Sequence, residues 1–350
     1  MQTAVFVGLA SFHNYKLFYL LIFVLGNAVI IRYLIVYAHL MEFVASKHNL
    51  ITGIFLFLDG LVYIYSPLIL IYFTKWTVYF SYMALGFSVA AIVLLAFFFH
   101  MPESLKFAMA TDDISKFQSD MEYICGLNGC PEQADRINSL LERYCAQVNA
   151  EAKTVGVEVG KAGLLRQVLN DKNVMRNLGL MVVCWVSTTF MYYLVIFFVK
   201  YLPGNIYTNQ VVSGLSAFSY LAAPFMARRY DNKRIMLIGY VVSLVFLVIM
   251  IVFQSVAINE VLYSFIFFLF KCGVTLVWLS LLVIHMDMFD TQFIASSYGI
   301  CNIISRLLTL GAPIVAEMEE RIWPLLIMLI LNVMALVATW FLKPQKPLCE

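Results

Sequence analysis

The fold is decided by one polar block, residues 101–176, which opens with MPESLKFAMATDDISKFQSDMEYICGLNGC (residues 101–130). This block differs sharply in composition from the sequence around it, because it holds eleven of the 21 acidic residues of the chain. Three apolar runs of membrane-crossing length and a shorter fragment precede it, and six such runs follow it. The block therefore divides the chain into two unequal halves.

The composition of the whole chain is that of a polytopic membrane protein. Of its 350 residues, 62% are hydrophobic and 13% are charged, with a mean hydropathy of +0.86. A soluble domain carries roughly a quarter charged residues, and a spanning helix needs about 20 mostly apolar residues. Nine runs meet that length: 16–41, 50–73, 78–99, 178–199, 210–226, 235–256, 261–284, 293–315 and 322–342.

A tenth apolar piece, residues 1–12, is about half a membrane thick. It has no basic start and no small-residue cleavage site, so it does not match a signal peptide. We expect a half-length helix there. The resulting prediction is an all-α membrane protein of about nine full transmembrane helices plus this shorter one.

The basic residues are distributed unevenly between the loops. Nine lie in the polar block, and others crowd one short turn (Arg228, Arg229, Lys233 and Arg234) or follow the last run (Lys343 and Lys346). The alternate loops hold one base or none. An excess of Lys and Arg marks the inner side of a membrane, so the polar block and the C-terminus are predicted to lie there. The formal net charge of +2 gives no indication of nucleic-acid binding.

Two local patterns stand out within the polar block. Apolar residues recur at helical spacing and predict an amphipathic helix over Ile137, Leu140, Leu141, Tyr144 and Val148. The stretch CGLNGCP (residues 125–131) predicts the turn before it. Its cysteines, Cys125 and Cys130, could bind a metal or form a disulfide, but no histidine is near and free thiols are the preferred interpretation.

Three basic residues lie inside apolar runs: Arg32, Lys271 and Arg306. An ionisable residue at membrane depth is costly and usually faces a cavity or a partner, although Arg32 could equally extend to the membrane surface. The sequence contains no nucleotide-binding loop, metal cluster or nucleophile paired with a base. We therefore expect neither an enzyme nor a cofactor other than bound phospholipid.

Several motifs occur in a recognisable order. They are VYAHLME (residues 36–42), PESLKF (102–107), ARRYDNKR (227–234) and YGICNIISR followed by GAP (298–306 and 311–313). They resemble V-Y-x-x-x-x-E, P-E-S-P-R-W, A-D-R-x-G-R-R-x and the span-eleven motif of the major facilitator superfamily, in its sugar-porter and organic-ion-carrier branch. Their order and spacing make the resemblance much stronger than any one motif does.

The resemblance implies two six-helix halves joined by a long inner loop. Residues 1–100 would correspond to spans three to six, 101–176 to the inner loop with its amphipathic helices and 177–350 to the second half, with spans one, two and part of three missing. Lys271 falls where span ten carries Lys or Arg, and the counterpart of Arg306 in organic-anion carriers faces the substrate cavity. If transport persists, these two residues are the expected substrate-binding groups.

The departures from the family pattern concern the inner charges that close such carriers. The family places a carboxylate and, seven residues later, an arginine at the inner ends of spans four and ten. Here Glu42 and Asp287 keep the carboxylates, but Asn49 and Ile294 replace the arginines. Two further differences are Arg228 and Asp231, where the loop after span eight carries Asp and Gly. The resemblance leaves a partial latch composed of Glu42, Glu103, Arg229 and Asp287.

These departures favour one function over another. The favoured hypothesis is a carrier-derived structural or accessory subunit of a larger membrane complex, whose exposed helix faces pack on lipids and on other membrane proteins. The alternative is an active secondary transporter of an organic ion, with an anion preferred because Lys271 and Arg306 are cationic, or of a sugar. A third reading is a truncated product, or a chain whose missing spans come from elsewhere. An organelle inner membrane would suit a large assembly.

Overall fold

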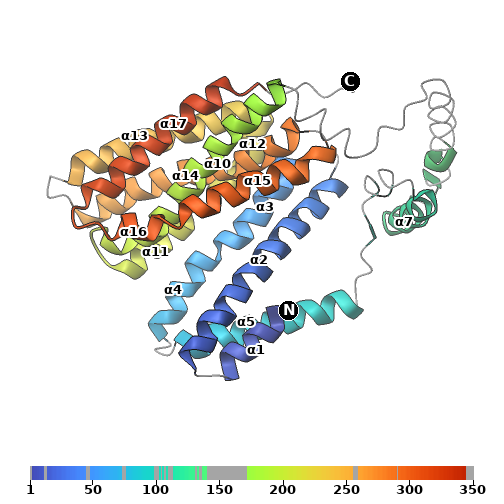
Figure 1. The fold of residues 1–350 in the computed structure, drawn as a ribbon, viewed down its shortest axis with the longest axis horizontal. Coiled ribbons are helices and arrows are strands. Elements are labelled where there is room, and N and C mark those ends of the chain that lie inside the picture. The colour runs from blue at the N-terminus through green and yellow to red at the C-terminus, as the bar shows by residue number, and fades with distance from the viewer. Residues whose placement is uncertain are drawn as a thin grey trace. The chain divides into compact units, whose positions relative to one another are not determined.

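The computed structural model describes residues 2–11, 14–44, 48–72, 76–97, 102–103, 105, 108, 113–130, 132–133, 136–139, 172–254, 259–289 and 291–343. Every regular element in these ranges is a helix (Figure 1), which confirms the predicted all-α class. The helices fall into two compact units, one of residues 1–46 with 73–158 and one of 47–72 with 159–350. The division predicted at residues 100 and 176 stays a prediction.

All nine predicted apolar runs fall on helices or helix pairs. Within the described ranges, six helical segments are long and apolar enough to cross a membrane: His48–Tyr72, Lys172–Tyr201, Asn232–Gln254, Glu260–Met288, Ser296–Ala316 and Ile322–Phe341. The runs 16–41 and 78–99 contain shorter apolar helical stretches, Tyr15–Val29 and Tyr82–Leu94. The run 210–226 is interrupted and forms two helices of ten residues each.

The first unit contains α1 (Gln2–Ser11), α2 (Tyr15–Phe43), α5 (Trp76–Phe97) and α7 (Ile114–Leu127). Helix α1 is the expected half-length helix, and it packs on α2 and α5. The Oγ atoms of Thr3 and Ser88 share a hydrogen bond of 2.5 Å between α1 and α5. The side chain of Asn14 accepts from the backbone N–H of Lys16 and caps α2, because the first N–H groups of a helix lack partners within it.

The polar block contains a helix, α7, whose position the sequence analysis did not specify. Helix α7 begins after Asp113, whose carboxylate accepts from the backbone N–H of Lys116. Its apolar side encloses a small buried cluster of Ala108, Phe117, Met121 and Cys125, with Leu105 and Ile137 packed against it. The predicted turn is present at Asn128 and Gly129, where Gly129 has a φ of 70°. The amphipathic helix predicted over 137–148 lies beyond residue 139 outside the described residues.

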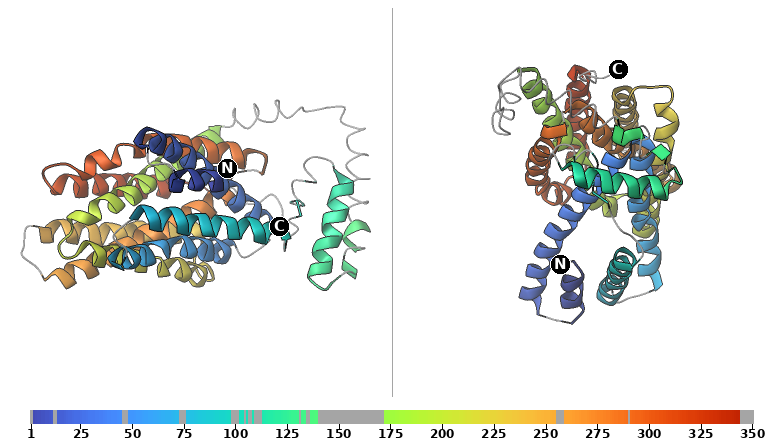
Figure 2. Two further views of the ribbon diagram at one scale, coloured as in Figure 1. Left: turned by 90° about the horizontal axis from the view of Figure 1, so that it is seen from below. Right: turned by 90° about the vertical axis from the view of Figure 1, so that its right-hand side faces the viewer.

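The second unit is a bundle built around one long helix. Its elements are α3 (His48–Gly60), α4 (Val62–Tyr72), α10 (Lys172–Phe198), η1 (Val199–Tyr201), α11 (Ile206–Leu215), α12 (Phe218–Ala227), α13 (Asn232–Gln254), α14 (Glu260–Met288), α15 (Thr291–Thr309), α16 (Ala312–Ala316) and α17 (Ile322–Phe341). Helix α14 is the most buried of the candidate spans. Figure 2 shows α10 and α13–α17, from green to red, running side by side.

Small residues and buried polar pairs hold this bundle together. A Cβ atom on Gly273 of α14 would lie 2.6 Å from the backbone nitrogen of Ser243 on α13, so only glycine permits this approach. Asn332 of α17 donates to Ser243 Oγ at 2.6 Å, and the hydroxyls of Thr188 and Tyr240 are 2.7 Å apart. Close backbones and interhelical hydrogen bonds are the usual means of helix association in a membrane, where burial of apolar surface does not distinguish protein from lipid.

Two interrupted spans of this unit pack against each other at their interruptions. The turn at Leu61 separates α3 from α4, and the turn at Ser216 and Ala217 separates α11 from α12. A Cβ atom added to Gly60 would lie 2.4 Å from the Cβ of Ala217. One added to Gly214 would lie 2.6 Å from Ile64 Cγ1. Glycine at both positions therefore allows the two irregular backbones to meet.

Candidate functional site

The two cations that the sequence analysis singled out lie against neighbouring tyrosines of α10. The ammonium of Lys271, on α14, is 4.3 Å from the ring centroid of Tyr192. The guanidinium of Arg306, on α15, is 5.1 Å from the ring centroid of Tyr193 and donates a hydrogen bond to its hydroxyl. The two tyrosine rings are 5.6 Å apart in an edge-to-face arrangement. The fold thus brings Lys271 and Arg306, which are distant in sequence, onto one pair of adjacent tyrosine rings.

Both cations lack an anionic partner within the part of the chain that the structure describes. Lys271 is only 4% exposed, and no described carboxylate forms an ion pair with it or with Arg306. The Nε atom of Arg306 is buried without a hydrogen-bond partner. A cation–π contact contributes about 0.5–2 kcal/mol, whereas burying a charge costs several kcal/mol. The aromatic contacts therefore offset only part of the cost of holding these charges here.

The tyrosine pair continues into a wider polar and aromatic network. The ring of Tyr192 stacks on Trp278 of α14 with centroids 5.3 Å apart. Its hydroxyl donates to the hydroxyl of Tyr63 on α4 at 3.4 Å. Asp59, one helical turn before Tyr63, interacts electrostatically with both tyrosines. Helices α3, α4, α10, α14 and α15 thus all contribute to this region, which we call the tyrosine cluster: Asp59, Tyr63, Tyr192, Tyr193, Lys271 and Arg306.

A buried histidine lies beside the cluster without forming part of it. The indole N–H of Trp185 donates to His285 Nδ1 at 3.2 Å, and His285 Nε2 lies 3.1 Å from Ser297 Oγ. Trp185 also contacts Trp278 edge-to-face at 6.0 Å. Both imidazole nitrogens are therefore engaged in fixing α10, α14 and α15 together. This role is structural, and we assign no ligand to His285.

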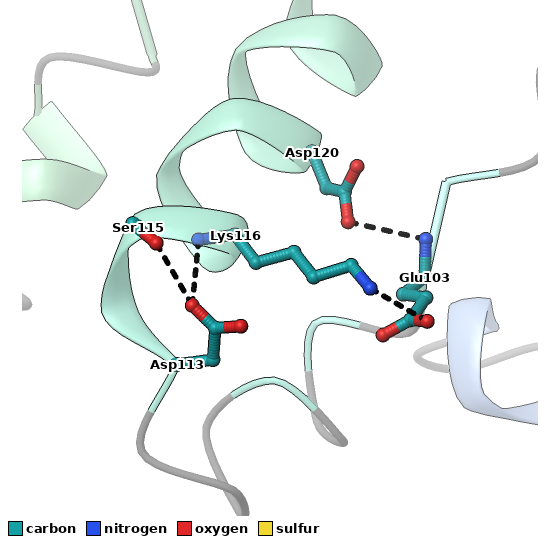
Figure 3. A network of polar contacts seen from close by, with 5 residues as sticks. All are labelled: Glu103, Asp113, Ser115, Lys116 and Asp120. Atoms are coloured by element: carbon teal, nitrogen blue, oxygen red, sulfur yellow. Dashed lines mark hydrogen bonds and ion pairs between the residues drawn. The ribbon is translucent and has the colours of Figure 1, made fainter.

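The predicted inner latch is distributed over both units. Glu103 forms an ion pair of 2.7 Å with Lys116, and its backbone N–H donates to Asp120 Oδ2 at 3.1 Å (Figure 3). This contact raises the pKa of Lys116, and the backbone N–H of Lys116 lowers the pKa of Asp113. The structure thus places Glu103 in a contact that joins the start of the polar block to α7. The side chain of Glu42 lies outside the described side chains.

The second unit holds the other two latch residues in different surroundings. Asn232, at the start of α13, donates to Asp287 Oδ2 at 3.0 Å and accepts from the side-chain amide of Asn49 at 2.8 Å. The position that the family occupies with arginine therefore still connects α3 to α13 and α14, through neutral amides. We call Asn49, Asn232 and Asp287 the amide relay. Arg229 is exposed and takes no part in it.

An ion cluster lies near the opposite end of the second unit. Glu317, in the turn after α16, accepts hydrogen bonds from Lys200 and Tyr201, and Arg321 lies 3.6 Å from the ring centroid of Tyr201. The two hydrogen bonds lower the pKa of Glu317 below its ordinary value of 4.5. The pKa of Glu317 is lower in the folded protein than in the unfolded one. The contact therefore stabilises the fold above pH 4.5, and this stabilisation is lost as the pH falls through the folded-state pKa.

Neither the two cysteines nor a groove beside α4 forms part of the candidate site. Cys125 and Cys130 are free thiols, and no group of three metal-ligating side chains occurs among the described residues. A groove of about 380 Å³ lies between α4, α10 and α11 and is lined largely by apolar side chains, among them Pro67, Leu70 and Ile196. It includes neither Lys271 nor Arg306.

The sequence analysis missed three features of the site. Tyr192 and Tyr193 occur in an apolar run rich in aromatic residues, so nothing in the pattern distinguishes them. Asn232 could not be recognised because its partners are distant in sequence. Asp59 did have a signal, since it is the one Asp, Glu, Lys or Arg in residues 48–72. A lone carboxylate inside an apolar run is a default functional candidate.

These features define an integral membrane protein of the carrier type: a polytopic helical bundle with ionisable side chains held inside it. The family model of the Major Facilitator Superfamily matches residues 2–313. The chain therefore belongs to that superfamily, whose members are generally transporters rather than enzymes.

One curated relative is also described as a transporter. The chain is 24% identical over 216 residues to "Putative transporter B0252.3" of Caenorhabditis elegans. The aligned part is 61% of this chain and 40% of the worm protein. The chain thus spans well under two thirds of the relative that it matches. Family and relative together indicate a transporter-like membrane protein.

Proposed function

We propose that this chain forms part of a secondary carrier that moves an organic anion across a membrane, with Lys271 and Arg306 binding the anion. The observation that carries the proposal is the presence of two membrane-embedded cations on neighbouring tyrosines, without a carboxylate partner among the described residues. Arg306 lies ten residues from each end of its candidate span, Ser296–Ala316. In secondary transporters the substrate site lies near the membrane midplane.

The accessory-subunit hypothesis, which the sequence departures favoured, gains no support from the family match or from the relative. Its main argument was the loss of the latch arginines at positions 49 and 294. The amide relay weakens that argument, because Asn49 retains a connection to Asp287 through Asn232. Two alternating arrangements with different contacts are what a carrier requires, and hydrogen bonds can supply such contacts as ion pairs do. We therefore place transport first.

The orientation belongs to the same proposal. The basic residues of the polar block and of the turn Arg228–Arg234 support an inner location for both. The membrane concerned, a bound phospholipid and other membrane subunits as partners are expectations that accompany it. The sugar-porter and organic-ion branch remains the finer assignment that the motifs favour.

The test is uptake by proteoliposomes that contain the purified full chain. The probes are radiolabelled benzenesulfonate and benzoate as anions, tetraethylammonium as a cation and glucose as a neutral solute. We expect the wild type to take up an anion above the protein-free background and Arg306→Ala to lose that uptake. Arg228→Ala is the matched control, since Arg228 also stacks on an aromatic ring, that of Phe225 at 5.4 Å, but lies outside the cluster.

Three outcomes would contradict the proposal. They are unchanged anion uptake by Arg306→Ala, a preference of the wild type for tetraethylammonium or glucose, and no uptake of any probe. In the last case, native gel electrophoresis of solubilised membranes decides the alternative. Stoichiometric migration with a larger assembly would support the accessory role.

A further inference from the structure

Helix α7, in the polar block, ends in a regular left-handed turn of the backbone. The N–H of Cys130 donates to the carbonyl of Cys125 at 3.0 Å, and the N–H of Gly129 donates to the carbonyl of Gly126 at 3.2 Å. Gly129 has a φ of 70°, in the left-handed region that glycine adopts without steric cost. Two such bonds around a left-handed glycine form the Schellman motif, which satisfies carbonyls that a helix end leaves free.

The two cysteines occupy the two positions of this motif whose side chains usually touch. Cys125 is the third residue before the C-cap Asn128, and Cys130 is the second residue after it. A contact between side chains at these positions frequently accompanies the motif. The backbone hydrogen bond between the two residues also limits the separation of their Cα atoms to about 7 Å, and disulfides join Cα atoms that are about 4.4–6.8 Å apart. The end of α7 therefore holds the pair close to the separation that a disulfide needs.

The two thiols differ in their access to solvent. Cys125 is 7% exposed and belongs to the buried cluster with Phe117 and Met121. Cys130 is exposed, and its Sγ donates to the carbonyl of Asn128 at 3.6 Å. A dissolved oxidant can therefore reach Cys130 but not Cys125. An accessible cysteine beside a second one that resolves its oxidised form is the usual arrangement of a redox-sensing pair.

We propose that Cys125 and Cys130 are a reversible redox modification site, in which Cys130 reacts with the oxidant and Cys125 then forms a disulfide with it. The inference is independent of the proposed transport. Both thiols are free in this structure, which therefore describes the reduced form. The polar block is expected on the inner side of the membrane. A cytosol-like compartment keeps thiols reduced, and disulfides formed there are usually transient, catalytic or redox-sensing.

The reaction balances with a low-molecular-weight disulfide, such as oxidised glutathione, as the oxidant. The Cys130 thiolate attacks one sulfur of the glutathione disulfide, a mixed disulfide forms and one glutathione thiolate leaves. The Cys125 thiolate then attacks the Cys130 sulfur of the mixed disulfide and displaces the second glutathione. The protons of the two cysteines pass to the two glutathione thiolates. The cysteine pair loses two electrons, and the glutathione disulfide gains them.

The test treats the purified full chain, reconstituted in lipid nanodiscs, with oxidised glutathione and then alkylates the remaining thiols. Trypsin cuts after Lys116 and Arg136, and the peptide between these cuts, residues 117–136, contains Cys125 and Cys130 and no further cysteine. We expect this peptide to resist alkylation and to be lighter by two hydrogen atoms, and we expect dithiothreitol to reverse the change. Cys125→Ser should stop at the mixed disulfide of Cys130 with glutathione, and Cys130→Ser should not react in this peptide.

Two glycine variants test whether the motif brings the thiols together. A Cβ atom at Gly129 or at Gly126 would meet nothing within 4 Å, but only Gly129 has a positive φ. A residue other than glycine is unfavourable in that conformation, so Gly129→Ala should slow disulfide formation about tenfold. Gly126→Ala is the matched control and should react at the rate of the wild type. Both variants retain the two cysteines.

Four outcomes would overturn the inference. The first is a peptide 117–136 that is still fully alkylated after oxidation of the wild type. The second is a wild type in which glutathione stays on Cys130, and the third is a disulfide of Cys130 with Cys145 in place of Cys125. The fourth is an equal rate of disulfide formation in Gly129→Ala and Gly126→Ala, which would show that the end of α7 does not hold the pair together.

Discussion

The hydroxyl of Tyr193 accepts the hydrogen bond that fixes the position of the Arg306 guanidinium. Arg306 donates to that hydroxyl and lies over the same ring, so one side chain supplies both a hydrogen bond and a π face. Lys271 has only the ring of Tyr192 in a comparable place. A guanidinium is planar and forms directional hydrogen bonds, whereas an ammonium acts as a compact charge. The contacts with Tyr193 therefore fix the orientation of the Arg306 side chain more closely than the ring of Tyr192 fixes that of Lys271.

Tyr193→Phe tests this control at the residue scale. The substitution keeps the ring and removes the hydroxyl, and a hydrogen bond to a charged group contributes about 1.5–3 kcal/mol. We expect the KM for the anion to rise about tenfold or more, with kcat changed less. Tyr207→Phe, at an exposed tyrosine on α11, is the control. Equal KM values for Tyr193→Phe and the wild type would show that the hydroxyl does not position Arg306.

At the scale of elements, glycines determine how two interrupted spans of the second unit, α3–α4 and α11–α12, meet. Gly60 and Gly214 lie where α3–α4 and α11–α12 approach with their backbones, and neither position has room for a Cβ atom. Tight packing of this kind resists extra volume because the neighbours can move only with their helices. The interruptions at Leu61 and Ser216 also leave helix ends whose groups need local partners. Ser216 supplies one such bond, donating to the carbonyl of Ser213 at 2.6 Å.

Gly60→Ala should therefore destabilise the protein although alanine is the better helix former. The new Cβ would lie 2.4 Å from Ala217 Cβ, and overpacking costs about 1–3 kcal/mol. Gly179→Ala on α10 is the matched control, since a Cβ there meets nothing within 4 Å. We expect a lower Tm in detergent for Gly60→Ala and an unchanged or higher Tm for Gly179→Ala. The same Tm for both variants would mean that the two interruptions are not closely packed in solution.

At the scale of the whole molecule, the amide relay joins residues that are 183 and 55 positions apart, Asn49 with Asn232 and Asn232 with Asp287. It ties the start of α3 to the start of α13 and the end of α14. Lys233, next to Asn232, donates to the carbonyls of Trp340 and Leu342 at 2.9 and 2.6 Å and fixes the end of α17. Neutral amides are less sensitive to salt than exposed ion pairs, because screening acts on charge.

Asn232→Asp tests whether the relay matters for the carrier. The substitution removes the donor to Asp287 and places two carboxylates together, so we expect a lower Tm and slower uptake at neutral pH. Both defects should lessen in acid, as one carboxylate of the pair takes up a proton. Asn302→Asp is the control, because the amide of Asn302 bonds within its own helix, to the carbonyl of Tyr298. Unchanged uptake by Asn232→Asp would remove the relay from the transport cycle.

The sequence by itself determined the class of the protein, most of its helices and its family. The length of the apolar runs predicts the class and the helices, because inside a membrane the backbone must satisfy its hydrogen bonds within helices. The order and spacing of the motifs indicate the family. Lys271, Arg306 and Asp287 could be selected because a charge inside or beside an apolar run is conspicuous. The position of helix α7 was missed because its short apolar side is surrounded by polar sequence.

Only the tertiary structure decided what these charges contact. No periodicity within α10 predicts that Tyr192 and Tyr193 receive Lys271 and Arg306, since the contact depends on how three helices are rotated about their axes. Nor could the sequence predict that Asn49 would keep its link to Asp287 through Asn232. Helix formation depends on bonds between near neighbours in the chain, whereas a site depends on packing between distant ones. Helix formation can therefore be predicted along the sequence, whereas the contacts of a site form only when the helices pack into the bundle.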